Sequence, residues 1–418
     1  MNSIFRYVLL LLLMNQTCII VAFSRNDTIQ LTRSFGMKMG GFLRVDAFYD
    51  TRQMYEAVEG MFSLYPMPPN LDASGKDINA SPCINLVSIA SRLNTRFFAP
   101  DVLGAKASAL LEIDFTGTSN TNGVRLRHAY LDFAWTKTSL LIGRSWHPLA
   151  NSMPTTLAIN LGSPFWVFNR SDQIRFNYRP QNWQFSVTAS YQSDYASLGP
   201  VGKSPSYLRN AIWPELTLNI EHQTPKTLIG IAGNTKTIKP CQFTTSLEDE
   251  TKYVTDETLT SFSGQLYLQY QSNEWKIKVQ STYHQNMNES LMIGGYAVST
   301  VNYATGHETY TPTQYMNYWI NVVYGTKWQT GLFAGYLNSL GTLDEVTTNV
   351  WYTRDHKIKY MYRLAPHLVY NINNWHFGIE FEYTTVSYGD IQPNTRGKIT
   401  NNKNVSNFRT LLSVSFYL

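Results

Sequence analysis

Apolar and polar residues alternate strictly in the segment 375–383, near the end of the chain. Its odd-numbered positions are all apolar or aromatic: Trp375, Phe377, Ile379, Phe381 and Tyr383. Two of the positions between them are the acids Glu380 and Glu382. A period of two predicts a β-strand, because successive side chains of a strand point to opposite faces. Aromatic residues at both ends of the apolar face are typical of a membrane-crossing strand, with Trp and Tyr at the two headgroup levels.

The same pattern recurs three times along the chain. Segments starting at Trp183, Trp275 and Trp328 each reach a tyrosine eight residues later, and each follows a short polar turn. Long polar connections separate the predicted hairpins, at residues 193–212, 237–259, 285–313, 338–356 and 387–406. Short turns on one side and long loops on the other predict an all-β, up-and-down antiparallel transmembrane β-barrel of about 16 strands.

The two ends of the predicted barrel carry further information. The first strand is predicted over 37–50 and the second over 87–97, followed by a turn at 99–101. In the fourth strand, 123–135, the alternation fails, which predicts a β-bulge near Ala129. The chain stops inside an alternating strand that ends at Leu418. This strand must pair with the first one, because an open sheet edge in lipid leaves backbone groups unsatisfied.

Composition agrees with a barrel of this kind. Only 15% of the residues are charged, 14% are aromatic, and the mean hydropathy of −0.24 excludes a helical membrane protein. Residues 1–24 contain Arg6, an apolar run and small residues at the end, which predicts a secretory signal peptide. Residues 25–418 are then one barrel domain in the outer membrane of a Gram-negative bacterium. The net charge of +5 argues against bulk nucleic-acid binding.

One long connection, 147–172, has no strand period and is rich in proline and aromatic residues. Barrels of about 16 strands enclose a water channel unless something folds inside them. We expect this third long connection to fold inward and to narrow the pore, with an ordinary external loop as the alternative. The constriction residues predicted here are Pro148, Pro164, Phe165 and Trp166.

Arginines are concentrated on the polar faces of the strands around this loop. The predicted pore-lining, anion-attracting residues are Arg44, Arg92, Arg96, Arg125, Arg127, Arg144, Arg175 and Arg179. Acids are fewer, and Asp46, Glu112 and Asp114 are the predicted counter-charges. Arginine in a pore favours anions through its field and its two-pronged contacts to carboxylate or phosphate. The alternative is a structural ladder of arginine–acid pairs. On the far wall, Lys276 and Lys278 balance Glu380 and Glu382.

Motifs for chemistry are missing from the sequence. It has no HExxH motif, no GxSxG motif and no close Cys/His set, so we expect neither a catalytic site nor a metal or other cofactor. Cys83 and Cys241 lie in predicted loops and either form a disulfide or remain free thiols. The expected partners are outer-membrane lipid, lipopolysaccharide and small anionic solutes, with no nucleic acid.

Four segments between Gly41 and Pro180 resemble the DcaP-like family of trimeric outer-membrane porins. They are Gly41-Phe-Leu-Arg44-Val-Asp46, Arg125-Leu-Arg127-His-Ala129-Tyr130, Gly143-Arg144-Ser-Trp146 and Gln173-Ile-Arg175-Phe-Asn-Tyr178-Arg179. The resemblance implies a homotrimer whose pores pass small anions such as dicarboxylates. Independently, Ala105, Ala107 and Ala109 on an outward face are suited to close protein packing, which predicts a subunit contact at the first strands. Two alternative functions are a surface receptor or adhesin and a barrel enzyme.

Overall fold

The computed structural model describes residues 29–30, 35–117, 123–193, 195–392 and 394–418. The predicted signal peptide, 1–24, lies outside the described residues. The main sheet contains the strands β1 Ile29–Gln30, β2 Gly36–Asp50, β5 Cys83–Val87, β6 Arg92–Val102, β7 Ala105–Asp114, β8 Arg125–Ala134, β9 Thr138–Trp146, β10 Arg170–Tyr178, β11 Trp183–Tyr191, β14 Glu215–Gln223, β15 Thr227–Ile238, β18 Leu259–Gln271, β19 Trp275–Gln285, β20 Gly294–Val301, β21 Glu308–Gly325, β22 Trp328–Thr342, β23 Trp351–Arg354, β24 Ile358–Ile372, β25 Trp375–Ile391 and β26 Ile399–Tyr417. The loops carry the hairpins β3 Met54–Ala57 with β4 Phe62–Pro66, β12 Leu198–Gly199 with β13 Gly202–Lys203, and β16 Phe243–Thr245 with β17 Lys252–Val254, and the short helices α2 Ser206–Asn210 and η1 Asn288–Ser290.

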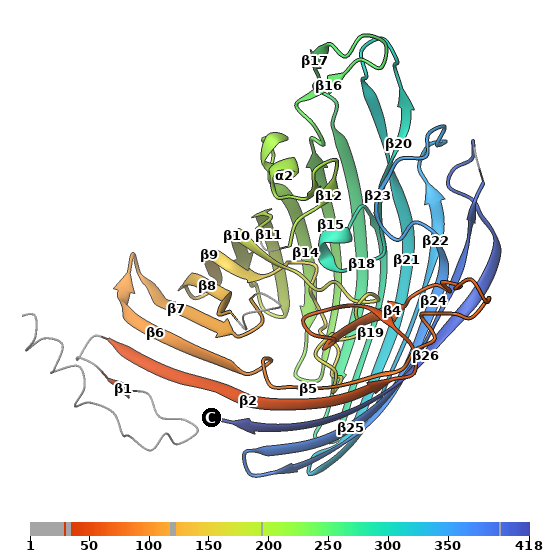
Figure 1. Cartoon of the computed structure of the whole chain (residues 1–418). Coiled ribbons are helices and arrows are strands. Elements are labelled where there is room, and N and C mark those ends of the chain that lie inside the picture. Colours follow the sequence, from red (N-terminus) through yellow and green to blue (C-terminus); the bar gives the residue numbers. More distant parts are fainter. Residues whose placement is uncertain (1–28, 31–34, 118–122, 194, 393) are drawn as a thin grey trace, which may run out of the picture.

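Sixteen of these strands form a closed antiparallel barrel within the described residues (Figure 1). Each strand pairs with the next one around the ring, and β26 returns to pair with β2 over Phe42–Asp50. Four further strands of the main sheet are not part of the ring. The strands β1 and β5 pair with β2, and β20 pairs with β21 and with β23. The predicted fold class and the predicted pairing of the last strand with the first are therefore confirmed. None of the described helices is long and apolar enough to cross a membrane.

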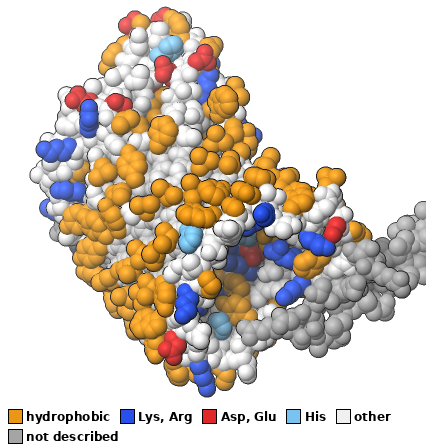
Figure 2. All heavy atoms as spheres, turned by 180° about the vertical axis from the view of Figure 1, so that it is seen from behind, with side chains coloured by type: hydrophobic (Ala, Val, Ile, Leu, Met, Phe, Trp, Pro, Cys, Tyr) orange, Lys and Arg blue, Asp and Glu red, His pale blue; other side chains and the backbone are white. Residues whose placement is uncertain are grey.

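Alternation along the strands separates an apolar outer face from a polar inner face. On β25, Trp375, Phe377 and Tyr383 are 40–44% exposed, whereas Glu380 and Glu382 are buried inside the barrel. Figure 2 shows hydrophobic side chains gathered over much of the outer face. Aromatic rings meet across neighbouring strands at the short-turn end: Trp275 with Tyr324, Trp328 with Tyr370 and Trp375 with Phe416. This belt is the surface that a bilayer covers.

Strand ends differ from the sequence prediction in several places. Residues predicted as one strand over 87–97 are divided between β5, which extends the sheet beside β2, and β6, which runs on to Val102. The predicted turn at 99–101 lies within β6, where a register shift between Ala99 and Val102 accommodates Pro100. The turn itself lies at Leu103 and Gly104, both with positive φ. At the long-loop end, β25 and β26 extend to Ile391 and from Ile399, so the last loop is shorter than predicted.

The predicted bulge exists, two residues earlier than expected. Glu112 pairs with His128 and Ile113 pairs with Leu126, so Arg127 is the extra residue on β8. Because the bulge resets the alternation, the side chains of both Arg127 and His128 are buried inside the barrel. Ala129 is therefore beside the bulge and not within it.

Two glycines of the family-like segments have a steric reason to be glycine. Gly41 on β2 and Gly143 on β9 have φ of 149° and 125°. A Cβ atom at Gly41 would lie 2.2 Å from the carbonyl oxygen of Arg92, and one at Gly143 would lie 2.3 Å from that of Ala129. Both strands thus approach a neighbour more closely than any other residue permits.

The barrel wall is uneven in height. Strands β9 and β10 have nine residues each, whereas β21 has 18 and β26 has 19. Figure 1 shows β6 to β10 as a low wall. The strands from β18 to β25 rise well above it and are called the high wall. The long loops of the high wall thus stand over the interior of the barrel.

Candidate pore and constriction

The connection between β9 and β10, residues 147–169, folds into the barrel. Phe165, Trp166 and Phe168 are fully buried, and Trp166 donates to the carbonyl oxygen of Asn151 in the same loop at 2.7 Å. Residues 170–172, predicted as part of the loop, are the first residues of β10. The predicted inward loop is therefore present, and we call residues 147–169 the constriction loop.

Side chains from several walls hold the backbone of the constriction loop. Arg44 on β2 donates to the carbonyl oxygen of Leu157 at 2.7 Å, and Lys278 on β19 donates to that of Met153 at 2.6 Å. The carboxylate of Glu380 on β25 accepts the N–H groups of Leu157 and Ala158 at 2.8 and 3.1 Å. Since β2, β19 and β25 lie on different parts of the ring, the loop crosses the interior of the barrel.

A second segment joins it from above. The hairpin β3–β4 in the first long loop packs inside the barrel, and the rings of Phe62 and Phe168 meet edge-on at 4.8 Å. Arg363 on β24 donates to the carbonyl oxygens of Leu64 at 2.6 Å and Ser163 at 2.8 Å, so one guanidinium ties both inward segments to the wall. No periodic pattern in the sequence predicts this hairpin as an inward element.

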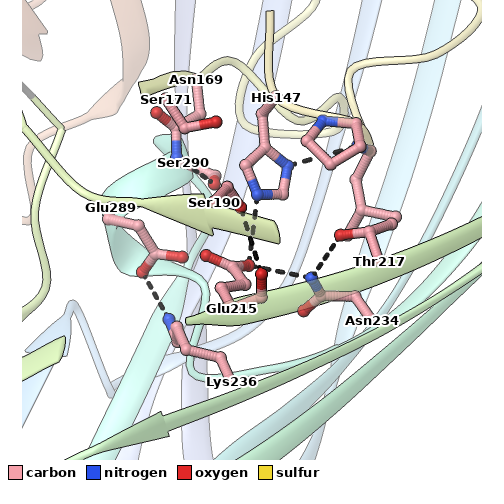
Figure 3. A network of polar contacts seen from close by, with 12 residues as sticks. His147, Asn169, Ser171, Ser190, Glu215, Thr217, Asn234, Lys236, Glu289 and Ser290 are labelled. Carbon is pink, nitrogen blue, oxygen red and sulfur yellow. Dashed lines mark hydrogen bonds and ion pairs between the residues drawn. The ribbon is translucent and has the colours of Figure 1, made fainter. Parts of the chain in front are cut away.

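Both ends of the constriction loop are fixed by a buried polar network (Figure 3). His147 Nε2 lies 3.2 Å from the Glu215 carboxylate on β14, which also accepts from Asn234 at 2.9 Å. At the other end, Asn169 donates to the hydroxyl of Ser290 in η1 at 3.2 Å. The residue before Ser290, Glu289, pairs with Lys236 on β15 at 2.8 Å. The loop cannot swing out without breaking these buried contacts.

As a result, one side of the interior is a packed apolar core. Phe165 and Trp166 of the loop and Phe62 of the hairpin belong to a single cluster with wall residues such as Trp319 and Phe333. Glycines at 335 and 378 make room for it, because a Cβ there would lie 2.6 Å from Phe165 or Leu157 atoms. We call this side, formed by β21 to β26, the packed wall.

The opposite side, formed by β6 to β10, carries the arginines and is called the basic wall. The arginines on its inner face, with the one directly after β10, are Arg92, Arg96, Arg125, Arg127, Arg170, Arg175 and Arg179. By alternation, the inward acids on the same strands are Glu112, Asp114 and Asp132. Within the described residues the basic wall therefore has four more positive than negative side chains.

Some of these arginines are neutralised and others are not. Arg125 pairs with Asp114 at 2.8 Å, and Arg127 pairs with Glu112 at 2.7 Å and with Asp114 at 3.0 Å. Arg44 on β2 pairs with Asp46 at 2.9 Å. In the described part of the chain, no ion pair forms at Arg92, Arg96, Arg175 or Arg179. Arg96 approaches Tyr130, Arg175 donates to the carbonyl oxygen of Trp146, and Arg179 donates to Gln184. The ladder alternative thus describes only part of the set.

Arg170 is a member of this set that sequence reasoning missed. It is 1% exposed, stacks against Trp146 at 5.2 Å and donates to the Tyr195 hydroxyl at 3.0 Å. Its Nε and Nη1 atoms have no hydrogen-bond partner among the described residues, and the same is true of Arg92 Nε. Its position near the end of the predicted loop 147–172 concealed it. The only signal was that it directly precedes the alternation of β10.

Arg144, another predicted pore residue, pairs with Asp172 on β10 at 3.0 Å. The side chain of Asp172 is 48% exposed. This pair lies at the rim of a cavity of about 620 Å³, the entrance cavity, which Arg125, Lys203, Arg354 and Glu289 also line. The entrance cavity is therefore basic as well.

The remaining candidates take no part in the pore. Cys83 and Cys241 are both free, and Cys241 lies 3.3 Å from the Tyr310 hydroxyl, so the optional disulfide does not form. His284 and His367 are buried in the wall, beside Asn317 and Glu380. No group of three or more His, Cys, Asp or Glu side chains suited to a metal ion occurs in the described residues.

Comparison with known proteins supports the fold. No protein-family model matches the chain, and no curated protein sequence matches it. Among solved structures, the outer membrane channel DcaP of Acinetobacter baumannii is similar at a TM-score of 0.69 and 17% identity, over 94% of this chain and all of that one. An anion-selective porin from Comamonas acidovorans is similar at a TM-score of 0.54 and 9% identity, over 92% of this chain and all of that one. OmpT of Vibrio cholerae, recorded also in a trimer form, is similar at 0.55 and 10% identity, over 94% of this chain and all of that one.

At these identities the likeness establishes the fold. The chain has the architecture of an outer-membrane porin, and the predicted resemblance to DcaP-like porins is confirmed at this level. The barrel is of the outer-membrane type, as the sequence predicted.

Proposed function

We propose that this protein is a passive outer-membrane channel for small hydrophilic solutes, with a preference for anions, dicarboxylates among them. The observation that carries the proposal is the excess of arginines on the basic wall that form no ion pair among the described residues. The opposite side of the interior is filled by the packed wall and the inward loops. Fixed positive charge in a narrow, low-dielectric passage raises the local concentration of anions and excludes cations. The basic entrance cavity at the loop end places the same sign of charge where a solute would arrive.

A planar-bilayer recording in a potassium chloride gradient tests the preference. The expected reversal potential has the sign of chloride selectivity, and succinate added on one side should carry current when it replaces chloride. A cation-selective reversal potential would contradict the role given to the arginines. The receptor alternative would be favoured if the protein showed no conductance but still bound a surface partner through its long loops.

We further propose a homotrimer whose subunits contact one another at the low wall, β6 to β10. Ala107 and Ala109 have the outward parity of β7 and are half-buried, and small side chains there let protein surfaces approach closely, whereas Ala105, predicted with them, is fully buried within the chain. Replacing Ala107 with Trp should shift native-gel mobility from trimer to monomer, whereas unchanged mobility would count against this contact. Lipopolysaccharide around the remaining outer face is the expected lipid partner.

A further inference from the structure

A second cavity lies at the loop end of the high wall, next to the entrance cavity. It has a volume of about 930 Å³ and is formed by the first long loop, the turn after β23 and the upper ends of β25 and β26. We call it the mouth cavity. It shares Leu198 and Arg354 with the entrance cavity. Its size lies at the upper end of the range of about 300–1,000 Å³ that small-molecule sites occupy.

Aromatic rings form much of its lining. Tyr55 and Tyr65 meet at 4.9 Å with their planes tilted by 47°, and Trp351 stacks on His356 at 4.9 Å and 11°. Tyr388 is held by a 2.6 Å hydrogen bond from its hydroxyl to the carbonyl oxygen of Pro66. Tyr55 is 39% exposed. All five rings line the cavity.

Charged groups of both signs lie between the rings. The cations are Arg354, Lys357 and Lys403, and the acids are Asp355 and Asp390. Asp355 accepts the backbone N–H of Lys357 at 3.1 Å, and no ion pair to it occurs in the part of the chain that the structure describes. Burial lowers the pKa of His356 to about 4, so its ring is uncharged at neutral pH. The mouth cavity is thus nearly balanced in charge, in contrast to the basic entrance cavity.

This composition excludes most ligand classes. A small anion would face Asp355 and Asp390, and a cation would face Arg354 and two lysines. A purely apolar ligand would remove five charged groups from water without hydrogen bonds in return, which is costly. A hydroxyl group, by contrast, both donates and accepts, so it can bond to a carboxylate and to an ammonium group. The ligand that fits has many hydroxyl groups and C–H faces that pack on the electron-rich faces of aromatic rings.

We infer that the mouth cavity is a binding site for a pyranose saccharide of a few sugar units. Tyr55 and Trp351 stack on the C–H faces of the sugar rings. Asp355 and Asp390 accept hydrogen bonds from the hydroxyl groups, while Lys357 and Lys403 donate to them. The site is separate from the proposed anion preference, because that proposal rests on the arginines of the basic wall and the mouth cavity shares only Leu198 and Arg354 with the entrance cavity.

Calorimetric titration of the detergent-solubilised barrel tests this inference. The probes are neutral oligosaccharides, maltotriose and cellotriose, with succinate and spermidine as an anion and a cation without sugar rings. Saturable binding of at least one neutral sugar is expected. Asp355→Asn should weaken that binding roughly tenfold or more, because a hydrogen bond to a charged acceptor is lost. Tyr55→Ala should weaken it by a similar factor through the lost stacking surface.

The matched control is Tyr253→Ala on β17, a tyrosine of similar exposure, 37%, in another loop. It should bind sugar as the unmodified protein does. Chloride selectivity, measured on the same variants, should be unchanged in all three, which shows that the barrel is intact and separates this inference from the channel proposal. Failure of both neutral sugars to saturate, equal binding by Tyr55→Ala, or tighter binding of succinate or spermidine than of sugar would overturn the inference.

Discussion

The basic wall and the packed wall of the barrel interior follow the same rule of alternation and reach opposite results. On β6 to β10 the inward positions carry arginines, several of which lack an ionic partner in the described structure. On β21 to β26 they carry Trp319, Phe333 and Leu337, which pack against residues from two inward loops. Alternation decides which side chains point inward. What they meet there depends on the loops that fold into the barrel.

Removal of a large ring of the constriction loop from the packed core is the strongest way to break this contrast. Trp166→Ala removes a fully buried side chain, and a cost of about 3–5 kcal/mol in unfolding free energy is expected because a cavity remains. Urea unfolding of the barrel in lipid vesicles measures it. Trp213→Ala, at a position that is 70% exposed, deletes the same atoms and should cost no more than about 0.5 kcal/mol. Equal losses for both variants would show that the interior is not packed around Trp166.

Loss of an anchor of the constriction loop comes next. Glu380→Gln leaves one carbonyl oxygen for the two N–H groups of Leu157 and Ala158 and places its own amide against them. A loss of about 1.5–3 kcal/mol is expected, since the bonds to a charged acceptor are lost. The loop should also fluctuate more, which single-channel recording detects as added current noise. Glu274→Gln, in an exposed turn, is the control and should change neither quantity.

Much of the barrel could be predicted from the sequence, because strand periodicity is a local property. The outward face of β25, the bulge in β8 and the closure of β26 on β2 all follow from neighbouring residues and the demand for backbone hydrogen bonds in lipid. The packed wall could not be predicted in this way. It depends on contacts between residues far apart in the sequence, such as Arg363 with Leu64 and Ser163, and no period records them.

Prediction of the site was similarly divided. The arginines on regular strands were found because alternation places them inside, whereas Arg170 was hidden where β10 begins within an apparent loop. Arg144, predicted for the pore because of its neighbours, lines the entrance cavity together with Arg125. Pairing between Arg127 and two acids also required the register of β7 and β8, which single-strand patterns do not give.

A smaller effect is expected where the basic wall depends on close strand contact. Gly143→Ala introduces a Cβ at φ 125° that would lie 2.3 Å from the carbonyl oxygen of Ala129. A destabilisation of about 1–3 kcal/mol is expected from backbone strain, measured by the same urea unfolding. Gly233→Ala on β15, where a Cβ meets no atom within 4 Å, is the matched control. If neither glycine substitution changed the free energy of unfolding, β8 and β9 would be able to move apart with no loss of stability.

The smallest effect tests the basic wall most directly. Arg170→Gln removes one buried positive charge that has no ion pair among the described residues, and it keeps a side chain that can still donate to Tyr195. At separations of about 10 Å and an effective dielectric constant of about 20–80, one charge changes the energy of a passing anion by about 0.4–1.7 kcal/mol. The ratio of chloride to potassium permeability should therefore fall roughly two- to seventeenfold. Lys359→Gln, at an exposed position on the high wall, should leave the ratio unchanged. If Lys359→Gln lowered the ratio as much as Arg170→Gln, selectivity would come from the net charge of the protein. If only Arg170→Gln lowered it, solutes pass close to the basic wall, as the filling of the opposite side requires.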